Sequence, residues 1–270
     1  MSIDVLQPEA ADLDHARRFG GLDRLYGAAG AARIRSSHVM VIGIGGVGSW
    51  AVEALARSGV GRITMVDMDH VSESNINRQV HATQTTLGQS KIVAMQERIN
   101  LINPACKVSC IDDFVTPENW QFIVSSGVNV IIDACDQVHA KVAMAAWAMK
   151  HTGNKVNKPL FISVGAAGGK RLAHLVDIDD LSKTTHDPLL AQLRYRLRKE
   201  HGAAREGKKI GLTCVFSKEA VLQPDRTADV AVADNTLNCS GYGSVVSVTA
   251  TFGQCAAGWA MDKLANLAEI

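Results

Sequence analysis

The ten residues VIGIGGVGSW (residues 41–50) carry the strongest structural signal in this chain. The four apolar residues 39–42 run into a cluster of glycines, and the sequence beyond the cluster is typical of a helix. Gly43, Gly45 and Gly48 form a G-x-G-x-x-G motif, and Gly46 adds a fourth glycine. In this motif the first glycine permits a tight turn, the middle ones let the backbone approach phosphate, and the last lets helix and strand pack closely. The stretch therefore predicts a nucleotide-binding turn between a strand and a helix.

Strand and helix patterns alternate along the first two thirds of the chain. Apolar runs typical of buried strands cover residues 38–45, 62–69, 107–115, 128–136 and 159–169, and a later one covers residues 211–222. Helical patterns cover residues 48–59, 91–100 and 140–151. This alternation predicts an α/β fold of the Rossmann-like, doubly wound type, with a mainly parallel sheet and a C-terminal elaboration.

The alternation changes after residue 169, where a charged and partly helical stretch begins. No repeat or low-complexity linker separates the two parts, so we expect one domain over residues 1–270. Within it, residues 1–37 are expected to form an N-terminal helical segment and residues 38–176 the nucleotide-binding core. Residues 177–270 are expected to serve substrate binding and dimerisation.

The composition is that of an ordinary soluble protein, with 47% apolar and 20% charged residues. The net charge of +1 gives no general attraction to nucleic acid, so such binding would need a local basic patch. The N-terminal residues lack the apolar core of a signal peptide, which predicts a cytoplasmic protein. The six cysteines include no CxxC pair, so we expect neither a structural zinc site nor a disulfide framework.

One long uncharged stretch raises a membrane alternative. Residues 235–261 contain no Asp, Glu, Lys or Arg, and their later part is long enough to approach a bilayer span. The same stretch is rich in Gly, Ala, Ser and Thr and poor in Leu and Ile. We therefore expect a helix in the protein core or in a dimer interface, and membrane association is the less favoured alternative.

Acidic, amide and cationic residues follow the second predicted strand in close succession. They are Asp67, Asp69, Asn75, Arg78, Gln79 and Lys91. A glycine-rich turn followed by an acid at the tip of the next strand is typical of nicotinamide-dependent oxidoreductases, which also need an apolar slot for nicotinamide. This chain instead supplies two cations that suit a row of phosphates. The pattern favours a nucleoside triphosphate, and an oxidoreductase or a non-catalytic nucleotide-binding module remains the alternative of another class.

The combined motif resembles the ubiquitin-activating-enzyme-like superfamily. The motif consists of GIGGVGS (43–49), DMDHVSESNINRQ (67–79), GQSK (88–91) and the acid of DACDQ (133–137). The resemblance implies ATP with Mg²⁺, and attack of a carboxylate on the α-phosphate with loss of pyrophosphate. It assigns the ribose to Asp67, the phosphates to Asn75, Arg78 and Lys91, and Mg²⁺ to Asp136. Arg78, Lys91 and Asp136 are then the catalytic residues, because they neutralise charge on the leaving group. The remaining predicted nucleotide-binding residues are Gly43, Gly45, Gly46, Gly48, Asp69 and Gln79.

Stretches outside the combined nucleotide motif match a narrower group. They are RRFGGLDRLYG (17–27), DDFVTPEN (112–119), DPLLAQLRYRLR (187–198), CVFSKE (214–219) and NCSGYGS (238–244). Together they are similar to the tRNA threonylcarbamoyladenosine dehydratases over nearly the whole chain. That resemblance implies adenylation of the free carboxylate of threonylcarbamoyladenosine in tRNA, a ligase-type step, followed by cyclisation with loss of water.

A basic segment is the candidate tRNA-binding surface. Arg194, Arg196, Arg198 and Lys199 lie close together, and more cations follow as far as Lys209. Cations at this density attract the phosphates of a nucleic acid. A solvated helical face would show the same composition, so the pattern alone leaves both interpretations open.

The resemblance also implies a homodimer and an association with a cysteine desulfurase or sulfur-acceptor system. Cys239 is the candidate thiol for a sulfur relay. In related enzymes an arginine of an N-terminal motif reaches the ATP of the partner subunit. Here glycine replaces the second arginine of that motif. Arg18 and Arg24 are the candidates to take over its role. The first rival function is activation of a small sulfur-carrier protein at the same ATP site. Enzymes of that kind usually hold zinc through two CxxC pairs, and this chain has none.

Overall fold

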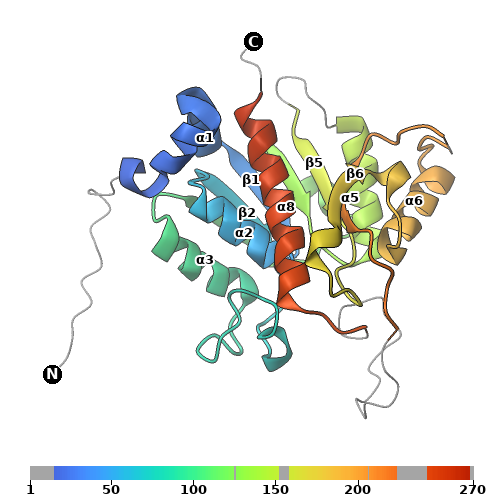
Figure 1. Ribbon diagram of the computed structural model, residues 1–270, viewed down its shortest axis with the longest axis horizontal. Coiled ribbons are helices and arrows are strands. Elements are labelled where there is room, and N and C mark those ends of the chain that lie inside the picture. Colours follow the sequence, from blue (N-terminus) through green and yellow to red (C-terminus); the bar gives the residue numbers. More distant parts are fainter. Residues whose placement is uncertain (1–14, 125, 152–157, 206, 224–241, 268–270) are drawn as a thin grey trace.

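A seven-stranded sheet forms the centre of the computed structural model (Figure 1), which describes residues 15–124, 126–151, 158–205, 207–223 and 242–267. The strands are β1 (His38–Ile42), β2 (Arg62–Val66), β3 (Lys107–Ile111), β4 (Val130–Asp133), β5 (Leu160–Val164), β6 (Val176–Asp180) and β7 (Thr213–Ser217). The helices of the described ranges are α1 (His15–Ser36), α2 (Gly48–Arg57), α3 (Lys91–Ile102), α4 (Trp120–Ile123), α5 (Val138–His151), α6 (Pro188–Glu200) and α8 (Val246–Ala265). Short 3-10 helices are η2 (Glu73–Asn75), η3 (Ala173–Leu175) and η4 (Leu181–Lys183). The arrangement confirms the predicted Rossmann-like α/β fold.

The strand order contains a switch in chain direction between β1 and β4, in the interior of the sheet. The order is β3-β2-β1-β4-β5-β7-β6, and every pair is parallel except β6 with β7. The chain leaves β1 toward β2 and β3, and then crosses to β4 on the other side. Ile42 pairs with Val66 on one side and with Asp133 on the other. The residues that follow these three strand ends therefore meet at the crevice where ligands bind in such sheets.

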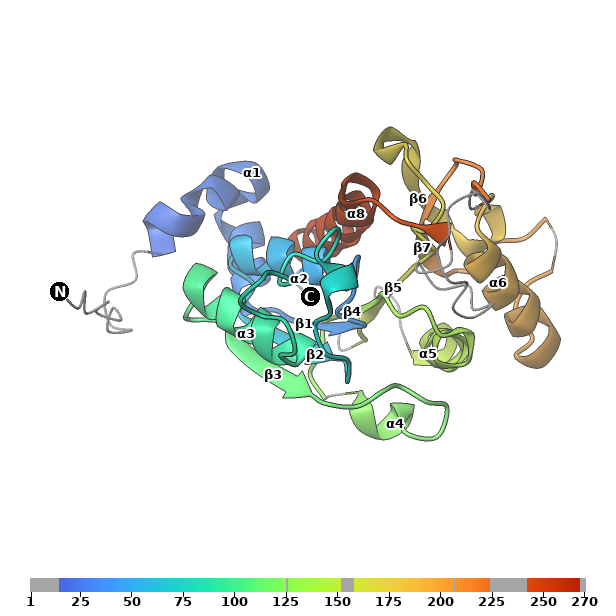
Figure 2. The same ribbon diagram turned by 90° about the horizontal axis from the view of Figure 1, so that it is seen from below.

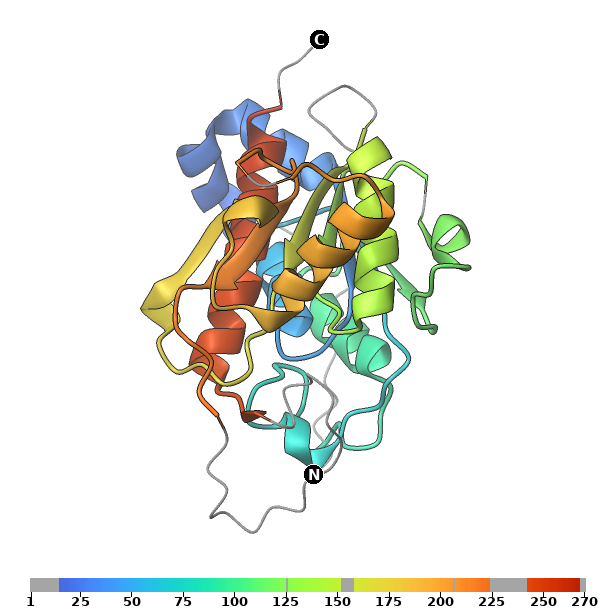
Figure 3. The ribbon, with the colours of Figure 1, turned by 90° about the vertical axis from the view of Figure 1, so that its right-hand side faces the viewer.

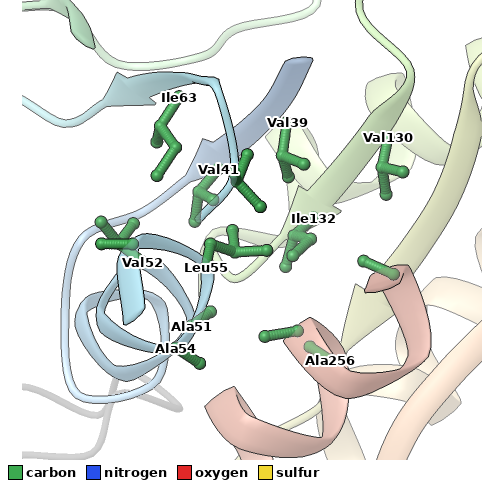
Figure 4. Close-up of a cluster of buried hydrophobic side chains, with 14 of the residues drawn as sticks. Val39, Val41, Ala51, Val52, Ala54, Leu55, Ile63, Val130, Ile132 and Ala256 are labelled. Carbon is green, nitrogen blue, oxygen red and sulfur yellow. The ribbon is translucent and has the colours of Figure 1, made fainter. Parts of the chain in front are cut away.

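Alternate residues of the central strands pack into two apolar layers, one on each face of the sheet. Val39 and Val41 face α1, α2, α3 and α8, and the close-up in Figure 4 shows them with Leu55 of α2 and Ala256 of α8. Met40 on the same strand faces the layer formed by α4, α5 and α6. Figure 2 shows α8 and α5 on opposite sides of β4 and β5. Figure 3 shows α5 and α6 side by side in the second layer. Because both faces are covered, the strands read as continuous apolar runs.

The uncharged C-terminal stretch forms a core helix over its described part. In α8, Val248, Phe252, Ala256 and Ala260 are buried within this one chain. Gly253 lets α8 approach α2, since a Cβ atom at this position would lie 2.4 Å from the carbonyl oxygen of Val47. The expectation of a core helix is confirmed for this part. No helix within the described ranges is long and apolar enough to cross a membrane.

The charged stretch after residue 169 contains a strand that the sequence pattern did not predict. β6 reads VDIDD, and all five residues are half-buried. It lies at the edge of the sheet and pairs antiparallel with β7. An edge strand with charged side chains is protected from pairing with other chains, so acids are compatible with this position.

Candidate functional site

A cavity of about 440 Å³ opens at the carboxyl ends of the central strands. It is lined by the loops after β1, β2, β3, β4 and β5 and by single residues of α3, α5, α6 and α8. Ten of the predicted nucleotide-binding residues line it: Gly43, Gly45, Gly46, Asp67, Asp69, Asn75, Arg78, Gln79, Lys91 and Asp136. The structure thus brings together residues that are spread over almost a hundred positions of the chain.

The glycine loop is built by two close backbone contacts. Gly43 has a φ of 83° and donates its N–H to the carbonyl of Val66 at 2.9 Å. A Cβ atom on Gly48 would lie 1.8 Å from the carbonyl oxygen of Gly43, so no larger residue fits there. A Cβ atom on Gly45 would meet no atom within 4 Å, because this residue faces open space. Gly43 and Gly48 therefore shape the turn, while Gly45 leaves room for a ligand.

The helix behind this loop begins at the cavity. The N-cap residue Val47 forms no side-chain capping bond, and Gly46 and Val47 both line the cavity. The first backbone N–H groups of a helix have no intrahelical acceptor, and they carry partial positive charge. The start of α2 is therefore suited to an anion such as a phosphate.

Asp67 holds the glycine loop against the end of β2. Its carboxylate accepts the N–H of Ile44 at 2.6 Å and the N–H of Asp69 at 2.8 Å. Burial raises the pKa of Asp67, although nearby Lys91 and the two backbone N–H groups oppose this shift. Both oxygens are already engaged within the protein, so a ribose hydroxyl would share an acceptor that also fixes the loop.

Two cations approach the cavity from the segment after β2. The buried Lys91 forms an ion pair with Asp69, with 2.7 Å between Nζ and Oδ2. Arg78 donates from Nη1 to the carbonyl of Ser74 at 2.5 Å and to Oδ1 of Asn77 at 2.8 Å. Nε and Nη2 of Arg78 donate no hydrogen bond to the described residues. The guanidinium is therefore oriented by the loop and keeps donors for a ligand.

The two amide residues predicted for this site behave differently. Asn75 accepts the N–H of Ser72 at 3.1 Å and forms a capping box around η2, so its side chain shapes the loop. Gln79 is 5% exposed, and its Oε1 has no hydrogen-bond partner within the part of the chain that is described. A buried acceptor without a partner is costly. The Gln79 side chain is therefore suited to a donor on a bound molecule.

Asp136 enters the cavity from the loop between β4 and α5. This exposed acid shares the lining with Cys135 and Gln137 of the same loop. Mg²⁺ is commonly held by one or two carboxylates together with phosphate oxygens, so a single acid beside a phosphate site fits this ion. Among the described residues, no group of three or more His, Cys, Asp or Glu side chains could hold a metal by itself.

Several cavity residues were missed by the sequence interpretation. They are Asp113, Phe114 and Val115 after β3, Gly165, Ala166 and Ala167 after β5, Leu189 of α6 and Thr249 of α8. Asp113 and Leu189 lie in stretches that supported the family resemblance, which was a usable signal. Thr249 had no such signal, because it reaches the glycine loop only through the packing of α8 on α2, where its Oγ1 lies 3.5 Å from the carbonyl oxygen of Arg78.

Arg194, the first cation of the predicted tRNA surface, forms its hydrogen bonds within the protein. Its Nη1 donates to the carbonyl of Leu181 at 2.9 Å, and to the carbonyl and hydroxyl oxygens of Thr184 at 3.0 Å. These bonds fasten α6 to η4. Within the structure, Arg194 therefore acts as an anchor for the helix.

The other cations of α6 are only partly free. Arg196 is half-buried and pairs with Glu200 at 3.2 Å, and Arg198 is half-buried and donates to the carbonyl of Ala204 at 3.1 Å. Lys199 is exposed. The exposed cations that continue beyond the helix are Arg205, Lys208 and Lys209. The accessible positive charge therefore lies at the end of α6, and with a rise of 1.5 Å per residue this is about 15 Å from the start of the helix beside the cavity.

The N-terminal arginines lie away from the cavity. Arg18 donates to the carbonyl of Ile102 at 2.8 Å, and Arg24 is exposed on α1. Neither lines the cavity of this single chain. Cys239 lies outside the described residues.

Known proteins resemble this chain over almost its full length. The ThiF family profile matches residues 18–270. The tRNA threonylcarbamoyladenosine dehydratase of Haemophilus influenzae is 44% identical over 253 residues, which cover 93% of this chain and 94% of the relative. The crystal structure of E. coli tRNA N6-threonylcarbamoyladenosine dehydratase in complex with ATP has a TM-score of 0.79 at 41% identity, covering 92% of this chain and 94% of that chain. The complex of that E. coli protein with AMP has a TM-score of 0.83 at 41% identity, covering 95% and 97%.

Proposed function

We propose that this chain, which belongs to the ThiF family, catalyses the ATP-dependent dehydration of threonylcarbamoyladenosine in tRNA. The observation that carries the proposal is the single cavity in which ten predicted ATP-binding residues meet. The fold that carries this cavity is similar to that of a relative solved with ATP and with AMP. An oxidoreductase would need an apolar slot beside the glycine loop, whereas this cavity places Arg78, Lys91 and Asp136 there.

ATP can be placed in the cavity by the chemistry of its walls. The triphosphate lies over the glycine loop and the start of α2, within reach of Arg78 and Lys91. The ribose lies at Asp67. The adenine has an apolar wall available at Phe114 and Val115. The partnerless Oε1 of Gln79 accepts a hydrogen bond from the bound nucleotide or the substrate.

The activation step joins the substrate carboxylate to the α-phosphate. A carboxylate oxygen of threonylcarbamoyladenosine forms the new P–O bond, and the bond to the β-phosphate breaks with release of pyrophosphate. Arg78 and Lys91 stabilise the negative charge that develops on the departing oxygens. Asp136 would hold Mg²⁺, which supplies further charge neutralisation at the phosphates.

The second step closes a ring within the substrate. The carbamoyl group of the modification attacks the activated carbonyl and AMP leaves, so the net change is the loss of one water from the nucleoside. The protein's task is to hold the two groups together and to keep bulk water from the adenylate. The activation is ligase-type chemistry and the product is cyclic threonylcarbamoyladenosine.

The tRNA is proposed to contact the exposed cations at the end of α6. Lys199, Arg205, Lys208 and Lys209 can bind phosphates of the stem while the modified base enters the cavity. We also propose that the protein acts in the cytoplasm, as a homodimer.

Pyrophosphate exchange into ATP tests the proposal. The exchange should require tRNA that carries threonylcarbamoyladenosine, and the same tRNA transcribed without the modification should be inactive, because it offers no carboxylate. Mass spectrometry should then find the nucleoside lighter by one water. Exchange that depends on a small carrier protein and not on tRNA would indicate the sulfur-carrier activator. Calorimetry that finds binding of NAD and none of ATP would indicate an oxidoreductase.

A further inference from the structure

A fully buried ion pair lies beneath the cavity. The side chains of Lys141 and Asp133 are both 0% exposed, with 2.8 Å between Nζ and Oδ2. The ammonium also donates to Oγ of Ser163 at 3.1 Å and to the carbonyl of Val164 at 2.9 Å. Ser163 in turn donates to the same carboxylate oxygen at 2.7 Å. The cluster of Lys141, Asp133 and Ser163 is therefore satisfied within the protein.

The cluster ties together the three elements that carry one wall of the cavity. Asp133 is the last residue of β4, Val164 is the last residue of β5, and Lys141 lies in the first turn of α5, where its own N–H donates to the carbonyl of Gln137. The residues that follow the two strand ends, 134–137 and 165–167, line the cavity. A single ammonium thus sets the spacing of two loops.

The other carboxylate oxygen reaches the loop directly. Oδ1 of Asp133 accepts the N–H of Cys135 at 3.3 Å, and Cys135 immediately precedes Asp136. Burial disfavours the charged form of Lys141, but Asp133 outweighs this effect and the pKa of Lys141 lies above its usual value. The ammonium therefore stays charged and keeps its bonds across the neutral pH range.

Stability alone does not explain such a pair. Replacing a buried ion pair by apolar residues of similar volume is often neutral or stabilising, because desolvating two charges is costly. A cluster of this kind is more useful where backbone atoms must be held in one place. We infer that Lys141, Asp133 and Ser163 are positioning residues that fix the Asp136 loop and residues 165–167 relative to the bound nucleotide, an inference that rests on the proposed function.

The test compares variants that differ in whether they leave a buried charge. Lys141→Met alone leaves Asp133 unpaired and should lower the melting temperature. The double variant Asp133→Asn, Lys141→Met has no buried charge and should fold. In it, kcat for tRNA dehydration should fall by roughly tenfold to a hundredfold, because small displacements of a reacting group cost that much. The Kd of ATP, measured by calorimetry, should change by less than about threefold, because the bonds lost act on alignment more than on binding.

Hydrogen exchange without ATP gives a readout that is independent of activity. In the double variant, the amides of residues 134–137 and 165–167 should exchange faster than in the parent. Glu53→Gln is the matched control: Glu53 is also buried and pairs with Arg57 and Arg98, but it does not line the cavity. It should lower the melting temperature and leave kcat and the exchange of both loops unchanged.

The outcomes separate the inference from the proposed function. A folded double variant with the parent's kcat and loop exchange would overturn the positioning role. If the double variant does not fold, Ser163→Ala decides, since it keeps the ion pair and removes one link between β4 and β5. Faster loop exchange and a lower kcat in Ser163→Ala support the inference, and parent values overturn it. If the proposed function is wrong, the parent protein itself will have no tRNA-dependent turnover. The hydrogen-exchange comparison would still test the positioning role in that case.

Discussion

Arg78 and Asp136 face the same cavity from opposite sides of the switch point. Arg78 is carried by the segment after β2, and Asp136 by the loop after β4. The loop around Arg78 orients its guanidinium through Ser74 and Asn77, so most of the cost of ordering this long side chain is met before a ligand arrives. Each residue can therefore act on the phosphates without a rearrangement of the fold.

Removal of either side chain should damage catalysis and spare the structure. Arg78→Ala and Asp136→Ala should each lower kcat by about two to three orders of magnitude, the usual effect of losing one preorganised electrostatic group. Arg57→Ala, which removes an exposed arginine of α2, is the control and should retain activity. Steady-state kinetics of AMP formation measures the effect, and circular dichroism checks the fold. Near-parent turnover in either variant would remove that residue from the catalytic set.

His81 should make the protein sensitive to acid. This side chain is 2% exposed, and neither ring nitrogen has a hydrogen-bond partner within the described residues. Burial, aided by Lys91 and Arg98, lowers the pKa of His81 to about 4 from 6.5. Between these two pH values the unfolded chain binds a proton that the folded chain does not, so stability falls as the pH falls.

Urea unfolding across this range measures the contribution of His81. The loss from this one residue should amount to roughly 3 kcal/mol between pH 7 and pH 4. His81→Leu should remove it, so its free energy of unfolding should fall less steeply than that of the parent below pH 6.5. Above pH 7 the two curves should run parallel. Equal slopes below pH 6.5 would contradict the assignment.

At the scale of elements, α6 has two ends with different tasks. Its first turn is capped by Asp187, which accepts the N–H of Leu190 at 2.9 Å and also the N–H of Ala166 at the cavity. Its last turn leads into the exposed cations. The helix thus connects a wall of the cavity to a surface suited to phosphate.

Charge reversal at the far end of α6 should weaken tRNA binding specifically. The double variant Lys199→Glu, Lys208→Glu should bind tRNA at least about tenfold more weakly, and the slope of log K against log salt should decrease by about two. The control Lys107→Glu, Lys263→Glu makes the same change in net charge at exposed lysines on the far edge and the other face of the sheet. ATP binding should be unchanged in both. Equal tRNA affinity in the two variants would identify the end of α6 as a solvated face.

At the scale of the whole molecule, the outer side of α8 remains a candidate contact surface. The inner side of this helix packs on α1, α2 and the sheet, but Val246 is 39% exposed and Cys255, Trp259 and Met261 are only half-buried. Light scattering at micromolar concentration should find twice the chain mass of 28.9 kDa, as proposed for a homodimer. A mass of one chain at that concentration would exclude a stable dimer.

The sequence by itself determined the class of fold and most of the nucleotide site. Two local patterns can be recognised without knowledge of the fold. They are the spacing of Gly43, Gly45 and Gly48, and the acids and cations that follow the strands. Parallel strands bring their carboxyl ends to one edge, so a list of strand-end residues already predicts which side chains meet. The edge strand β6 escaped prediction because its burial is partial and its charges hide the strand pattern.

Only the tertiary structure decided contacts between elements that are distant in the chain. Thr249 joins the cavity because Gly253 lets α8 approach α2 closely. In the sequence, Lys141 is one polar residue within an apolar helical pattern. Only the fold shows that β4 and β5 lie beside it. The charge of Arg194 suggested a nucleic-acid ligand, whereas the folded chain supplies it with three acceptors. Residue types and periodicity are encoded locally, but the partner of a buried charge depends on packing, which no local pattern contains.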